Sequence, residues 1–129
     1  MNKILVIDDS FYDQLIFKEI VESFWPDAEV SSVDSAEEAI DFLKLQALKK
    51  DLLPDYIFLD IKMPTMDGFG FLKHYPEIEK KMEKSPLIYM LSSSLDPYDI
   101  ERAQNSPYVT AFLEKPISDE FIENLRSKE

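Results

Sequence analysis

The chain has 129 residues, no cysteine and a formal net charge of −12 at neutral pH. Its length fits one domain, and its charge argues against nucleic acid or an anionic membrane as a direct partner, because both bind basic surfaces. No apolar stretch is long enough for a signal-peptide core or a membrane span, and without cysteine there is no disulfide framework. We therefore expect one soluble domain, residues 1–129, located in the cytoplasm.

Short apolar runs alternate with amphipathic stretches along the chain, a pattern that indicates alternating strands and helices. Four of the runs are apolar enough for strands buried on both faces of a sheet, and the second run is weaker. In chain order we expect a strand at 3–8, a helix at 10–24, a strand at 29–33, a helix from Ser35, a strand at 55–60, a helix after Gly68, a strand at 87–91, a helix from Pro97, a strand at 109–114 and a helix from Ser118.

Two expectations about the helices depend on single residues. Ile16, Ile20 and Phe24 recur at helical spacing, so they are expected on one face of the first helix. Pro76 lies inside the third helix and has no backbone N–H to donate. A kink, or a restart of the helix through residue 83, is therefore expected there.

Five strand–helix units predict an α/β fold, a three-layer sandwich around a five-stranded parallel sheet. The flavodoxin-like strand order 2-1-3-4-5 fits five such units and places the switch point between the first and third strands. Asp8 and Asp9 follow the first strand, and Asp60 ends the third. This topology would bring three carboxylates together.

Charged and hydroxyl side chains stand at the carboxyl ends of four expected strands, where open α/β sheets bind ligands. They are Asp8, Asp9, Asp60, Ser92 and Lys115. Clustered carboxylates repel one another, and Mg2+ would relieve the repulsion, since it takes oxygen ligands and often shares them with phosphate. The plainer alternative is that the first two acids only cap the helix that follows.

Asp60 is the candidate nucleophile, because an aspartate can accept a phosphoryl group to form an acyl phosphate. Lys115 would pair with a carboxylate or a phosphate oxygen as a point charge. Ser92 would offer a hydroxyl donor to the same phosphate. The alternative for Asp60 is a turn residue at a strand end, satisfied by loop amides.

Four segments resemble the response-regulator receiver domain of two-component signalling. They read Ile7-Asp8-Asp9-Ser10, Phe58-Leu59-Asp60-Ile61-Lys62-Met63-Pro64-Thr65-Met66-Asp67-Gly68, Leu91-Ser92-Ser93 and Glu114-Lys115-Pro116. Each segment alone is weakly specific. All four occur in order at the separations typical of the family, and the resemblance covers nearly the whole chain.

The resemblance implies how the site would bind its ligands. Asp60 would take a phosphoryl group from a phosphohistidine on a histidine kinase or phosphotransfer protein. The metal would be Mg2+, bound by Asp60, directly by Asp9 and largely through water by Asp8. The backbone carbonyl of Lys62 would complete the protein ligands.

The resemblance also implies a conformational switch. Lys115 would contact the phosphoryl oxygens, and Ser92 would form a hydrogen bond that draws its loop inward. Phe112 occupies the aromatic switch position and would move with Ser92. Gly68 would permit the turn geometry of its loop, and Pro116 would follow a cis peptide bond, as is frequent in the family.

A receiver domain would be a signalling module and not an enzyme, apart from catalysing its own phosphotransfer and dephosphorylation. Residues 97–125 would face a downstream protein target, and the chain would be a monomer or a phosphorylation-dependent homodimer. Alternatives are a phosphate sink or relay intermediate, a receiver cut from a larger regulator, and an unphosphorylated scaffold. An aspartate-nucleophile phosphatase of the haloacid dehalogenase type is disfavoured, because it needs a second aspartate where Lys62 stands.

Overall fold

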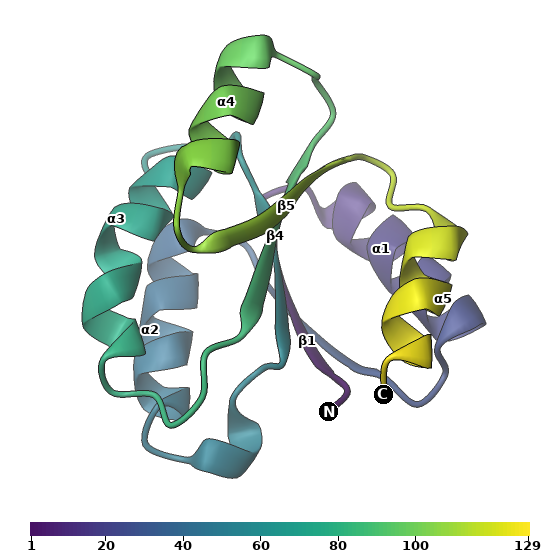
Figure 1. Ribbon diagram of the computed structural model, residues 1–129, viewed down its shortest axis with the longest axis horizontal. Coiled ribbons are helices and arrows are strands. Elements are labelled where there is room, and N and C mark those ends of the chain that lie inside the picture. The colour runs from purple at the N-terminus through teal and green to yellow at the C-terminus, as the bar shows by residue number, and fades with distance from the viewer.

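The computed structural model describes residues 1–129, apart from the side chain of Lys50. Strands and helices alternate along the chain, as expected (Figure 1). The elements are β1 (Lys3–Ile7), α1 (Phe11–Phe24), β2 (Glu29–Val33), α2 (Ala36–Gln46), the short 3-10 helix η1 (Lys50–Leu52), β3 (Tyr56–Asp60), α3 (Gly68–Glu79), β4 (Leu87–Ser92), α4 (Pro97–Asn105), β5 (Val109–Glu114) and α5 (Asp119–Ser127). None of the helices described is both long and apolar enough to cross a membrane.

The strands form one parallel sheet in the order β2-β1-β3-β4-β5, which confirms the flavodoxin-like topology. Helices cover both faces of the sheet (Figure 1). On one face α2 and α3 pack on the sheet, with Ala103 of α4 at the edge of their core cluster. On the other face α1 and α5 pack together on the opposite sides of the same strands. The expected three-layer sandwich is therefore confirmed.

The central strand β3 shows why the apolar runs are continuous. All five of its residues are buried, and successive side chains point to opposite faces. Ile57 and Leu59 enter the core under α2 and α3, whereas Tyr56 and Phe58 enter the core under α1 and α5. Because both faces of the strand are covered, no position on it favours a polar side chain until the strand ends.

The buried face of α1 includes residues beyond the expected apolar set. Gln14, Phe17 and Val21 are buried, whereas the expected Ile16, Ile20 and Phe24 are only partly buried. Ile20 and Phe24 still pack against the core under α1 and α5, but the apolar spacing does not show that a glutamine is buried on this helix. Its side-chain amide is satisfied by hydrogen bonds, so it does not need water, but an apolar pattern cannot detect it.

The third helix passes through Pro76 without a restart. It runs from Gly68 to Glu79, and the chain then turns, so the expected continuation through residue 83 is wrong. Tyr75 and Ile78 flank the proline and are both buried in the core. Their packing stabilises the last helical turn and offsets the backbone hydrogen bond that proline cannot make.

Candidate functional site

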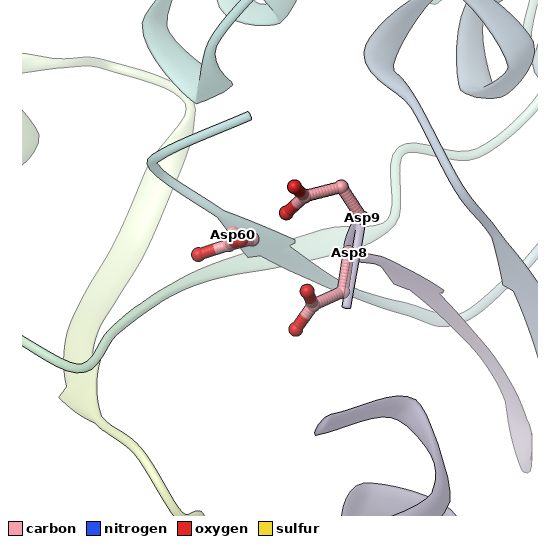
Figure 2. Close-up of side chains that lie close together, drawn as sticks. All are labelled: Asp8, Asp9 and Asp60. Carbon is pink, nitrogen blue, oxygen red and sulfur yellow. The ribbon is translucent and has the colours of Figure 1, made fainter. Parts of the chain in front are cut away.

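Three carboxylates meet at the carboxyl edge of the sheet (Figure 2). β1 ends at Ile7, so Asp8 and Asp9 lie in the turn that follows it, and Asp60 is the last residue of the neighbouring strand β3. One oxygen from each carboxylate lies within 4.8 Å of the others. Asp8 and Asp60 are buried and Asp9 is exposed, so the cluster opens to solvent on one side.

Asp8 is fixed by the backbone and by α1. Its amide donates to the carbonyl of Val33 at 3.1 Å, which extends the β1–β2 pairing by one residue. Its carboxylate Oδ1 accepts from the amide of Ser10 at 2.9 Å. Gln14 Nε2 donates to the carbonyl of Asp8 at 2.6 Å and to Asp34 Oδ1 at 2.9 Å, so it ties α1 to the ends of β1 and β2.

Lys115 is the cation of the site. It follows β5, its amide donates to the carbonyl of Ser92 at 2.8 Å, and the peptide bond to Pro116 is cis, as expected. Its Nζ lies 2.7 Å from Asp8 Oδ2 and 3.3 Å from Asp60 Oδ1. A third carboxylate, Asp13 on the first turn of α1, lies 2.9 Å away. The expected pairing of this lysine with the strand-end acids is therefore present.

The electrostatics of the site favour an added cation. The pKa of Asp60 is raised to about 7, mainly by burial and also by the negative charges of Asp8 and Asp9, against the lowering effect of Lys115. Burial alone would lower the pKa of Lys115, but hydrogen bonds to Asp8 and Asp13 raise it above its ordinary value. Three carboxylates, those of Asp8, Asp13 and Asp60, thus share one ammonium, and Asp9 adds a further negative charge to the cluster. A divalent cation among them would relieve the repulsion, and oxygen donors suit Mg2+.

The two expected switch residues lie on β4 and β5. Ser92 is the last residue of β4 and is buried, and its hydroxyl oxygen accepts from the amide of Ser94 at 3.0 Å. Phe112 lies on β5, opposite Met90 of β4. It is partly buried and packs against the core under α2 and α3. The concerted movement of Ser92 and Phe112 stays a prediction. The role of the Lys62 backbone carbonyl as a metal ligand also stays a prediction.

Gly68 has a different role from the expected one. It has no positive φ, whereas Thr65 does, with φ of 70°. The amide of Met66 donates to the carbonyl of Pro64 at 2.7 Å across Thr65, which makes a strained γ-turn. At Gly68 an added Cβ would lie 2.6 Å from the carbonyl oxygen of Asp60. The glycine therefore permits close approach of backbones and not a turn.

Two contacts were missed at the level of sequence, those of Asp13 and Gln14. Asp13 looks like an ordinary acid in the first turn of a helix, where the helix dipole favours negative charge. Its partner Lys115 is 102 residues away in the chain. Only the fold shows that the first turn of α1 lies against the end of β5, so no local signal could have found the contact.

The sequence of the chain matches a known protein family. Residues 4–126 match the family model of the Response regulator receiver domain. The chain belongs to this family. Receiver domains are generally signalling modules without a catalytic activity of their own, and they bind Mg2+ in an acidic pocket. In this receiver domain Asp8, Asp9 and Asp60 form a group of acids that could hold a metal ion.

Relatives agree with this assignment. The chain is 30% identical over 129 residues to "Two-component response regulator ORR1" of Oryza sativa subsp. japonica, an alignment that covers 98% of this chain and 54% of the rice protein. The receiver thus spans about half the length of that relative. A two-component response regulator from Cytophaga hutchinsonii has a TM-score of 0.86 at 28% identity, covering 98% of this chain and 94% of that one. A response regulator receiver protein from Dyadobacter fermentans has a TM-score of 0.83 at 28% identity, covering 98% and 95%.

Proposed function

We propose that this receiver accepts a phosphoryl group on Asp60 from a phosphohistidine of a histidine kinase or phosphotransfer protein. The proposal rests on the position of the Asp60 carboxylate. The carboxylate of Asp60 is buried at the end of the central strand, 3.3 Å from Lys115 Nζ and within 4.8 Å of Asp8 and Asp9. A carboxylate held between a cation and a metal-binding pair of acids is suited to phosphoryl transfer. The proposal includes the cytoplasm as the location, because a histidine kinase takes its phosphoryl group from ATP.

The transfer forms one bond and breaks one. An oxygen of Asp60 attacks phosphorus, the bond between phosphorus and the histidine nitrogen breaks, and the electron pair leaves with the imidazole. Asp8, Asp9, Asp60 and the carbonyl of Lys62 would hold Mg2+, which supplies positive charge next to the phosphoryl oxygens. Lys115 would stabilise the negative charge of the phosphoryl oxygens as a point charge.

The signal would leave through residues 97–125. The helix α4 at the start of this range buries only Asp99 and Ala103, so few contacts fix its position. A phosphoryl group on Asp60 that draws in the Ser92 hydroxyl would make room for Phe112 and shift α4 against β5. Such a shift is a change in the populations of two packings. A downstream protein, or a second copy of the chain, would bind the changed face.

Covalent labelling tests the acceptor. Incubation with acetyl phosphate and Mg2+ should add one phosphoryl group that hydroxylamine removes, because an acyl phosphate is labile to this nucleophile. Intact mass should show this adduct in the parent and not in Asp60→Asn. The matched control is Asp67→Asn, an exposed acid of the same loop that caps α3 and whose replacement is an equally good cap. Equal labelling of Asp60→Asn and the parent would contradict the assignment.

A further inference from the structure

Lys115 contacts one carboxylate that does not belong to the carboxyl edge of the sheet, that of Asp13 on α1. The ammonium is 2.7 Å from Asp8, 2.9 Å from Asp13 and 3.3 Å from Asp60. A lysine ammonium has three N–H donors, so three carboxylates can occupy all of them. In this resting arrangement Lys115 is closer to Asp13 than to the proposed acceptor.

Asp13 is also the partner that is easiest to release. Its side chain is 36% exposed, compared with 3% for Asp8 and 8% for Asp60. Water can therefore hydrate the Asp13 carboxylate when the ammonium leaves, so losing this pair costs less free energy than losing either of the others. Asp8 is held in addition by the amide of Ser10. Asp13 and Lys115 both line a cavity of about 270 Å³, which gives the ammonium room to move.

Phosphorylation of Asp60 changes what the ammonium must pair with. On Asp60 a phosphoryl group carries up to about two negative charges in place of the single charge of the carboxylate, and it adds three strong acceptor oxygens beside Lys115. To donate to them, the ammonium gives up one of its carboxylates. The negative charge of Asp13 also repels the phosphoryl group itself.

We propose that Asp13 is a positioning residue that restrains Lys115 in the resting protein and is released when a phosphoryl group arrives. Asp13 therefore weakens phosphoryl binding and sets how readily the site is filled. This inference rests on the proposed role of Asp60. Asp13 lies outside the group of acids that could hold the metal, so it acts through the lysine and not as a ligand.

A matched control separates this role from that of an ordinary first-turn acid. Glu120 stands in the first turn of α5, is exposed, and makes no ion pair with Lys115 among the described residues. Both Asp13 and Glu120 interact favourably with the dipole of their own helix. Only the first is expected to affect phosphoryl binding.

The experiment titrates beryllofluoride, an unreactive mimic of the phosphoryl group, in the presence of Mg2+. Amide NMR shifts would follow binding in the parent, Asp13→Asn and Glu120→Gln, each shown to be folded by thermal unfolding. Loss of one half-exposed competing charge should tighten binding by about three- to fivefold in Asp13→Asn, whereas Glu120→Gln should match the parent. In metal-free protein, the side-chain signal of Lys115 should move in Asp13→Asn toward its position in the beryllofluoride complex.

Two results would overturn the inference alone. One is equal or weaker beryllofluoride binding by Asp13→Asn while the parent binds normally. The other is a Lys115 signal in that variant that stays where it is in the resting parent. If the parent neither bound beryllofluoride nor accepted a phosphoryl group, the proposed function would fail and this inference with it. The two failures are therefore distinguishable.

Discussion

At the scale of single residues, the burial of Asp60 beside other acids has a cost in stability. Burial and the nearby acids raise its pKa from 3.8 to about 7, so the folded protein holds a proton there more tightly than the unfolded chain does. A group of this kind stabilises the fold fully below its unfolded pKa and loses that contribution as the pH rises through its folded pKa. Without a bound cation, ionised Asp60 therefore destabilises the fold above neutral pH.

Asp60→Asn should show this cost directly. Asparagine resembles the protonated carboxyl, so in metal-free buffer the variant should be more stable than the parent by about 2 kcal/mol at pH 8. The advantage should shrink toward pH 5. Urea unfolding at both pH values, with a chelator present, measures the difference.

Two controls accompany that measurement. Asp41→Asn changes an exposed acid of α2 and should show no such dependence on pH. Added Mg2+ should reduce the advantage of Asp60→Asn, because the cation binds the parent more tightly. A variant that is less stable than the parent at pH 8 would contradict this account of the site.

At the scale of elements, the close approach of α3 to the end of β3 shapes the site. Gly68 begins α3, and its amide donates to the carbonyl of Ile61 at 2.8 Å. The absence of a side chain there lets the helix start directly against the last residue of β3. The helix α4 is held in a different way. The guanidinium carbon of its Arg102 lies 3.8 Å from the centre of the Phe69 ring on α3. One helix is thus fixed by backbone contact, whereas a contact between side chains holds the other.

A pair of glycine substitutions tests the fixed contact. Gly68→Ala should destabilise the protein by about 2 kcal/mol, because the new Cβ meets a backbone oxygen that cannot move away. Gly70→Ala is the control. Its Cβ would come too close only to the flexible side chain of Met66 and would be in ordinary contact with Asp67 Oδ1. Because alanine also favours the helix, stability should change by less than about 1 kcal/mol. Denaturant unfolding of both variants compares them, and equal losses would contradict the close-approach explanation.

At the scale of the whole molecule, the order of the strands determines the site. Asp8, Asp9, Asp60 and Lys115 are far apart in the chain, but parallel strands bring their carboxyl ends to one edge. The sequence therefore predicted these residues, because strand ends and strand order are sufficient to place them.

Other features depended on contacts that a linear pattern does not contain. The burial of Gln14 on α1 was not predicted, because a glutamine whose hydrogen bonds are made can be buried without breaking an apolar pattern. The contact of Asp13 required the position of α1 relative to the end of β5. Thr65 adopts the left-handed conformation in place of the expected glycine, since backbone strain at a turn is tolerated when the surrounding structure fixes it.

The most direct test of the account is whether a phosphoryl mimic at Asp60 changes the distant output face. Beryllofluoride with Mg2+ should shift amide NMR signals of the parent along residues 92–125, well beyond the three acids and Lys115, and should leave Asp60→Asn unchanged. Shifts in the parent confined to the loops around Asp8, Asp60 and Lys115 would contradict the proposed switch. The receiver would then be a phosphate sink or a relay intermediate.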